Sequence, residues 1–254
     1  MSVQEWSQVR SDSLGMRTSV TVAVPESREG APAVPPAHGW PVLFLLHGLT
    51  GNHMQWPSHL DVQELATARG LVVVMPDGQR SFWVDAVHGM AWGTWVGSEL
   101  PTLVRSTLRV SDSPARTTVG GLSMGGYGAV RTALDHPGVF GAALSLSGTL
   151  DLTEPAFQRR HPDLFEHYLG GYAVAGGPHD LVSRIASGEG RDLRLFACCG
   201  TGDRLLDQNH RFRDAALAVG TPLVWGEGPG AHDFAFWREW LPRGLDATGT
   251  GPVR

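Results

Sequence analysis

Apolar segments that alternate with helical ones constrain the fold of this chain most strongly. Six segments have no polar face: "WPVLFLLHG", "LVVVMPDG", "RTTVGGLS", "VFGAALSLSG", "DLRLFACCGTGD" and "TPLVWGEG". Between them lie stretches with the length and pattern of helices of about three turns, such as "HLDVQELATARG" and "LLDQNHRFRDAALAVG". Strands buried on both faces and separated by helices are typical of a parallel sheet covered on both sides. The sequence therefore predicts a doubly wound α/β fold.

Length and patterning predict the domain organisation. The 254 residues are 42% hydrophobic, which suffices for one full core, and no linker divides them, so we expect a single domain over residues 1–254. Residues 149–191 have weaker periodicity, which predicts a partly helical insertion. A partial lid and an ordinary crossover with a decorated loop remain equally open there. Residues 245–254 are expected to form a flexible tail, and Thr18–Pro25, with alternating polar and apolar residues, an edge strand.

Charge and cysteine content limit the partners. All 20 basic residues are scattered arginines and the formal net charge is −5, so neither nucleic acid nor an anionic membrane is expected as a partner. The polar N-terminus and the short apolar runs predict a cytoplasmic protein without membrane insertion. The two cysteines, Cys198 and Cys199, are neighbours and predict no disulfide framework, metal site or redox chemistry. No cofactor is expected.

Ser123 lies in the pentapeptide "GLSMG", between Gly121 and Gly125. A buried strand precedes it and a helix follows it, which is the context of a nucleophile elbow. In such a turn the serine backbone is strained, and the two glycines leave room for strand and helix to approach. The helix start also directs its dipole and free amides toward the serine oxygen. The same pentapeptide also occurs by chance in glycine-rich turns that have no catalytic role. A nucleophilic Ser123 therefore requires catalytic partner residues elsewhere in the chain.

A serine nucleophile needs a base and an orienting acid, in the order Ser, Asp or Glu, His, each in a loop after a strand. His232 follows the last apolar strand, and Asp203 follows the strand before it. Asp207 lies one helical turn further and is expected on a helix surface or as a cap. Asp233 is too close to His232 to orient its ring. The other ten of the eleven histidines precede the serine, fall in the insertion or lie at helices, where surface, turn or core roles are expected.

Two backbone amides are expected to bind the oxyanion. One is that of Met124, directly after the serine, and the other is that of Leu49 in "LFLLHGLTGN". There a strand ends at His47, and Gly48 lets the backbone turn toward the site. Taken alone, this segment is equally well an ordinary strand end.

Nine tryptophans are many for this length, and several fall in or near loops that follow the early strands. We therefore hypothesise that Trp83 and Trp92 bind substrate in an aromatic pocket for short acyl chains. Core packing explains such residues equally well.

Six segments, taken together and in order, resemble successive blocks of the esterase family of α/β-hydrolases: "LLHGLTGNHMQW", "MPDGQRSFWVD", "WGTWVGSELPTLV", "GLSMGGYGAV", "CGTGDRLLDQNHRF" and "GPGAHDFAFWREWL". The resemblance covers about residues 43–241 and is strongest to the tributyrin esterases; esterase D, the S-formylglutathione hydrolases and the mycolyltransferases are relatives. It implies the α/β-hydrolase fold, self-association as a homo-oligomer, and a triad of Ser123, Asp203 and His232 with the amides of Leu49 and Met124 as oxyanion hole. The residue-based assignment agrees.

The resulting prediction is a serine carboxylesterase that acts on short-chain acyl esters, small molecules, through an acyl-enzyme resolved by water. Alternatives are acyl transfer to an alcohol or sugar, thioester hydrolysis as in the S-formylglutathione hydrolases, and a non-catalytic binding module. The intact triad argues against the module. The S-formylglutathione hydrolases usually have a cysteine where Gly51 stands, and the mycolyltransferases are exported, whereas no signal peptide is recognised here. The first departure disfavours thioester hydrolysis, and the second disfavours acyl transfer.

Overall fold

The computed structural model describes residues 3–27, 31 and 33–251. Over these residues one sheet has the strand order β1-β2-β4-β3-β5-β6-β7-β8. The pairs β1–β2 and β2–β4 are antiparallel, and the other neighbouring strands are parallel. The strands are β1 (Val3–Ser11), β2 (Met16–Ala23), β3 (Val42–Leu46), β4 (Val72–Pro76), β5 (Thr117–Leu122), β6 (Ala142–Leu146), β7 (Arg194–Gly200) and β8 (Leu223–Gly228).

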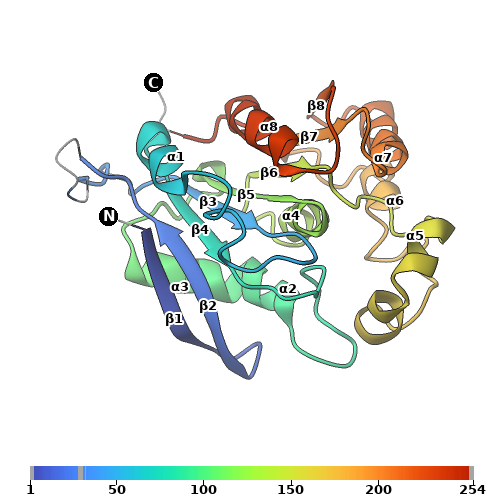
Figure 1. Ribbon diagram of the computed structural model, residues 1–254, viewed down its shortest axis with the longest axis horizontal. Helices are drawn as coiled ribbons and strands as arrows, with labels where there is room; N and C mark the ends of the chain where they lie inside the picture. The colour runs from blue at the N-terminus through green and yellow to red at the C-terminus, as the bar shows by residue number, and fades with distance from the viewer. Residues whose placement is uncertain (1–2, 28–30, 32, 252–254) are drawn as a thin grey trace.

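Helices cover both faces of this sheet (Figure 1). One face packs against α1 (Val62–Arg69) and α8 (Phe234–Ala247), and the other against α3 (Leu100–Thr107), α4 (Met124–Asp135), α6 (Leu181–Ala186) and α7 (Leu206–Ala218). Along β3, Leu43 and Leu45 face the first layer, whereas Val42 and Phe44 face the second. Every residue of β3, β4, β5 and β6 is buried. The predicted α/β fold is confirmed.

Short helices complete the layers. The segment before α3 starts as α2 (Trp92–Thr94) and continues through a π-helical stretch, Trp95–Glu99. A 3₁₀ turn, Pro114–Arg116, leads into β5. Among the described residues no helix has both the length and the apolar character needed to cross a bilayer.

The predicted edge strand at Thr18–Pro25 is an interior strand. This strand is β2, and it pairs with β1 on one side and β4 on the other. The edge strand on this side of the sheet is β1, whose side chains are mostly exposed. Because an exposed strand has no continuous apolar run, the polar sequence "VQEWSQVRS" gave no strand signal.

Residues 149–191 connect β6 to β7 and contain α5 (Pro155–Arg160), a π-helical turn (Leu164–Tyr168) and α6. Figure 1 shows α5 at the same end of the molecule as α6 and α7. Eight buried apolar side chains, among them Leu152, Phe157 and Phe165, join this segment to the core. Movement of the segment as a lid stays a prediction, as does a single domain over residues 1–254.

The structure differs from the predicted flexible tail at residues 245–251. Helix α8 continues to Ala247, and Thr248 and Thr250 after it are buried. The hydroxyl of Thr250 lies 2.8 Å from that of Thr118 in β5, which ties this end of the chain to the sheet. Residues 252–254 of the predicted tail lie outside the described residues.

Candidate active site

Ser123 occupies a strained turn between β5 and α4. Its backbone has φ +54° and ψ −118°, a conformation that costs a non-glycine residue about 1–3 kcal/mol. A Cβ on Gly121 would lie 2.5 Å from the Gly125 carbonyl, and one on Gly125 would lie 2.5 Å from the Leu46 carbonyl oxygen. Only glycine therefore fits at these two positions, which is the role predicted for them.

The structure brings Ser123, His232 and Asp203 together at one edge of the sheet. Asp203 follows β7 and His232 follows β8. The His232 Nε2 lies 3.0 Å from the Ser123 Oγ, and its Nδ1 lies 2.8 Å from an Asp203 carboxylate oxygen. An ionised carboxylate only accepts hydrogen bonds, so Nδ1 carries the proton and Nε2 of the neutral ring accepts from the serine hydroxyl.

Asp203 is held as a buried carboxylate. Burial by itself acts to raise its pKa, but the hydrogen bond from His232 acts against burial, as does the charge of that ring when it is protonated. The Leu205 amide, which donates to the same carboxylate at 2.9 Å, and the Ser147 side chain add to this effect. The net result is a pKa below the usual value for aspartate, so Asp203 is ionised at neutral pH.

Two residues that support this arrangement, Trp237 and Ser147, were not identified from the sequence. The Trp237 ring packs edge-on against His232, with ring centroids 5.0 Å apart. Its Nε1 donates to the hydroxyl of Ser147 at 3.1 Å. Ser147 is buried, follows β6 directly and has φ +47°. A polar residue at the end of an apolar strand was the available signal for Ser147.

The two residues whose amides are predicted to bind the oxyanion both lie beside Ser123. Met124 is the first residue of α4, so its amide has no acceptor within the helix. The Leu49 amide donates no hydrogen bond within the described part of the chain. Both residues line the same small cavity as Ser123.

His47 and Gln55 fix the loop that carries Leu49. The ring of His47 hydrogen-bonds to the Gly48 carbonyl through Nδ1, at 2.7 Å, and accepts from the Gly78 amide through Nε2, at 2.9 Å. The Gly48 amide donates to the side-chain carbonyl of Gln55 at 2.8 Å. The loops after β3 and β4 are thereby tied together beside the serine.

The cavity next to Ser123 has a volume of about 50 Å³. Its aromatic lining comes from Phe82 and Phe157, whose rings meet edge to face at 6.0 Å. A larger surface hollow of about 710 Å³, around His59 and Phe234, includes neither Ser123 nor His232.

The prediction that Trp83 and Trp92 line the acyl pocket is wrong for this cavity. Both are buried in the core, and neither borders the cavity. The Trp83 ring fills the space above two glycines: a Cβ on Gly78 or Gly128 would lie 2.4 Å from it. Its position after an early strand therefore reflects packing against α4.

The two aspartates that the sequence analysis did not favour as the triad acid lie outside the triad. Asp207 is exposed in the first turn of α7, and Asp233 caps α8 by accepting from the Phe236 amide at 3.1 Å.

Cys198 and Cys199 are free and buried. Within the described residues no cluster of three or more histidine, cysteine or acidic side chains could hold a metal ion.

Comparisons with known proteins identify the family of this chain. The family model described as "Putative esterase" matches residues 11–247. The chain is 28% identical over 216 residues to an acetyl esterase of Caldicellulosiruptor saccharolyticus, covering 80% of this chain and 81% of that protein. It is 30% identical over 205 residues to the S-formylglutathione hydrolase of Bos taurus, covering 71% of each.

A solved structure shows the same fold. FphF, a fluorophosphonate-binding serine hydrolase of Staphylococcus aureus, superposes with a TM-score of 0.82 at 25% identity, over 96% of this chain and 97% of that one. The family model and the bovine relative each span most of the chain. This chain is thus a member of the esterase family, a carboxylesterase with the α/β-hydrolase fold.

Proposed function

We propose that the chain hydrolyses short-chain carboxylic esters through Ser123, His232 and Asp203. The observation that carries this proposal is the continuous hydrogen-bonded path from the Ser123 hydroxyl through His232 to the Asp203 carboxylate. A serine hydroxyl becomes an effective nucleophile when a positioned base accepts its proton.

In the proposed mechanism His232 Nε2 takes the proton of Ser123 as the Oγ attacks the ester carbonyl carbon. The protonated ring then gives this proton to the leaving alcohol, and the acyl group remains bonded to Oγ. Water, deprotonated by the same nitrogen, attacks the acyl-enzyme and releases the acid. Asp203 stays ionised throughout and stabilises the cationic ring.

The negative charge of each tetrahedral intermediate develops on the former carbonyl oxygen. We assign its stabilisation to the amides of Leu49 and Met124, two residues that line the cavity beside the serine and whose amides donate no hydrogen bond within the described part of the chain. The dipole of α4, whose N-terminus adjoins Ser123, favours the same charge.

The small cavity supports a short acyl chain. Pockets that enclose drug-sized ligands measure roughly 300–1,000 Å³, whereas the cavity beside Ser123 measures about 50 Å³. The acetyl esterase among the relatives is consistent with a small acyl group.

Gly51 stands where the S-formylglutathione hydrolases usually have a cysteine, and on this departure we propose oxygen esters rather than glutathione thioesters as substrates. A Cβ at position 51 would lie 2.5 Å from the Gln55 side-chain amide, which holds Gly48. The cysteine usual in S-formylglutathione hydrolases would therefore displace Gln55 in this loop.

A chain-length series tests the substrate class. With 4-nitrophenyl acetate, butyrate and octanoate, we expect kcat/KM for octanoate to be lower than for butyrate by about tenfold or more, because a longer chain does not fit beside Phe82 and Phe157. Phe157→Ala should narrow this difference, whereas Leu217→Ala, on the exposed surface of α7, should leave it unchanged. Equal kcat/KM for all three esters in the wild type would contradict a short-chain preference.

A further inference from the structure

Two arginines line the cavity that contains Ser123. Arg160 is the last residue of α5, and Arg204 follows Asp203 directly. Both are exposed, and within the described residues neither guanidinium has an acidic partner or a hydrogen-bond acceptor. Two positive charges without counter-ions therefore lie at the edge of the proposed reaction site.

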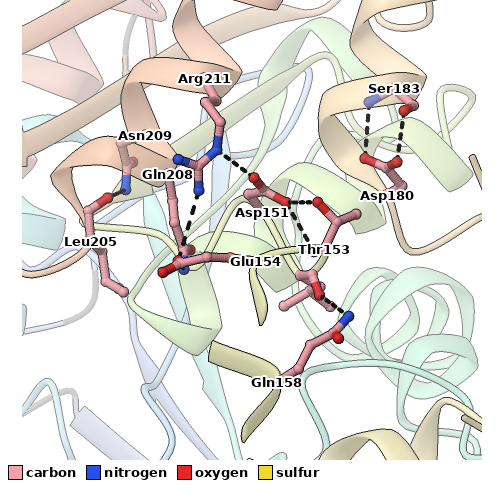
Figure 2. A network of polar contacts seen from close by, with 11 residues as sticks. Asp151, Thr153, Glu154, Gln158, Asp180, Ser183, Leu205, Gln208, Asn209 and Arg211 are labelled. Carbon is pink, nitrogen blue, oxygen red and sulfur yellow. Dashed lines mark hydrogen bonds and ion pairs between the residues drawn. The ribbon is translucent and has the colours of Figure 1, made fainter. Parts of the chain in front are cut away.

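The acidic side chains that flank α5 have other partners. Asp163 pairs with Arg80 at 3.2 Å. Asp151 accepts from Arg211 at 2.6 Å and from the Thr153 hydroxyl at 2.6 Å. In the same network, shown in Figure 2, the carboxylate of Glu154 accepts from Gln208. None of these carboxylates neutralises the two arginines that line the cavity.

The same network fixes the wall on which Arg160 lies. Glu154 precedes α5, and its contacts with Gln208 and Arg211 join this helix to α7 (Figure 2). Within α5, Gln158 donates to the Leu152 carbonyl at 3.1 Å. The helix is therefore anchored at its beginning, and Arg160 stands at its other end beside the cavity.

The pKa of His161 reflects the positive charge of the arginines around it. Its ring lies beside that of Phe157, with centroids 4.5 Å apart, and it also lines the cavity. Burial lowers the pKa of His161, and although Asp163 acts to raise it, the charges of Arg160, Arg80 and Arg204 lower it further. Three guanidinium groups thus act on one imidazole in a chain whose formal net charge is −5.

We propose that the site takes esters that carry an anionic group, a carboxylate on either the acyl or the alcohol part, which Arg160 and Arg204 bind beside Ser123. The proposal rests on the ester hydrolysis proposed above. Two donor-rich guanidinium groups suit a carboxylate, which accepts paired hydrogen bonds from arginine. The apolar rings of Phe82 and Phe157 cover the remainder of a small substrate.

The test compares each anionic ester with its neutral counterpart. For charge on the acyl part, monomethyl succinate is compared with dimethyl succinate by titrating the acid released. For charge on the alcohol part, 4-acetoxybenzoate is compared with its methyl ester. All rates are normalised to hydroxide-catalysed hydrolysis of the same ester, so that intrinsic reactivity is removed.

We expect the normalised kcat/KM of the anionic ester to exceed that of its neutral counterpart by about tenfold in at least one of these two pairs of esters, which are the two arms of the test. The arm with the preference identifies the part of the substrate that bears the charge. Raising NaCl from about 0.05 to about 0.5 M should reduce the preference, since salt screens exposed charges.

Variants assign the preference to the two arginines. Arg160→Gln and Arg204→Gln should each lower the ratio of anionic to neutral kcat/KM by about threefold or more, and the double variant should abolish it. Arg159→Gln is the matched control, because Arg159 is an exposed arginine of the same helix that does not line the cavity. It should leave the ratio at the wild-type value.

The outcomes separate this proposal from the one on which it rests. Absence of a preference in both arms, or a preference that both Gln variants retain, overturns the anionic substrate class while ester hydrolysis stands. If the wild type hydrolyses none of the four esters and no 4-nitrophenyl ester, ester hydrolysis itself is wrong and the anionic class falls with it.

Discussion

Asp203 acts on the serine only through the His232 ring. Its side chain has no exposed surface, and its hydrogen bond to Nδ1 leaves Nε2 facing the Ser123 hydroxyl. Without a negative charge at position 203 the ring is free to adopt the other tautomer, in which Nε2 carries the proton and accepts nothing. The carboxylate charge, rather than the shape of the residue, is therefore the property that the mechanism needs.

Replacing that charge gives the first prediction. Asp203→Asn should lower kcat on 4-nitrophenyl acetate by roughly 10³–10⁴-fold, because the amide donates to Nδ1 and selects the wrong tautomer. Asp207→Asn is the control, since it makes the same change on an exposed residue one helical turn away. Steady-state kinetics on variants with wild-type circular dichroism measure both, and a loss under tenfold in Asp203→Asn would remove Asp203 from the triad.

At the scale of elements, the site depends on how closely β5 and α4 approach the strand beside them. The backbone of Gly125 lies against the carbonyl oxygens of Leu46 and His47, at the end of β3. This contact sets where α4 begins and hence where Ser123 and the Met124 amide lie. A side chain at this point would move the helix away from the sheet.

Gly125→Ala should therefore destabilise the fold and reduce activity together. The added methyl would meet the Leu46 carbonyl oxygen at 2.5 Å, and such overpacking costs about 1–3 kcal/mol. Gly138→Ala is the matched control, because Gly138 has open space around it and an ordinary φ. Urea unfolding and esterase assays would show the difference; equal stability of the two variants would mean that the helix does not need this approach.

A second contact between elements joins the β1–β2 hairpin to the helical segment before α3. The carboxylate of Glu99 accepts from the hydroxyls of Ser11 and Ser13 and from the amides of Asp12, at 2.7 Å, and Ser13, at 3.1 Å. Burial acts to raise the pKa of Glu99, but these hydrogen bonds outweigh it and the pKa is lowered. The hairpin is thus held by an ionised group.

This contact predicts a pH-dependent stability. The pKa of Glu99 is lower in the folded protein than its ordinary value of 4.5, so its contribution is present above about pH 4.5 and is lost as pH falls through the folded-state pKa. Glu99→Gln should lower the free energy of unfolding at pH 7 by about 1–3 kcal/mol, and the difference from wild type should shrink near pH 3.

Urea titrations at both pH values measure this effect. Glu5→Gln removes the same charge from an exposed position on β1 and should change stability little at either pH. A Glu99→Gln variant as stable as the wild type at pH 7 would show that the hydrogen bonds to Glu99 do not hold the hairpin.

For the whole molecule, the parallel sheet explains how distant residues meet. Ser123 and His232 are 109 residues apart, yet both follow parallel strands, and the loops after such strands share one edge of the sheet. The loop after β3, with Leu49, and the loop after β7, with Asp203, reach the same edge. The strand order therefore assembles the site before any side chain contributes.

The parallel sheet also explains which parts of the fold and the site could be predicted from the sequence. Buried strands have continuous apolar runs, so the fold and the loops that follow the strands were predictable, and with them the positions of Ser123, Asp203 and His232. Strand β1 was missed because its exposed residues lack such a run. Trp83 was misplaced because an aromatic residue near a loop packs equally well into the core, and only tertiary structure decides between the two.

The central claim is that Ser123 is the nucleophile, and one substitution tests it most directly. Ser123→Ala removes the hydroxyl, and the account predicts that kcat/KM on 4-nitrophenyl acetate falls by roughly 10⁴-fold or more, since members of a triad act as a unit. Circular dichroism and urea unfolding should show an intact fold, and Ser58→Ala, an exposed serine far along the chain from Ser123, should keep full activity. Activity near the wild-type value in a folded Ser123→Ala variant would contradict the mechanism.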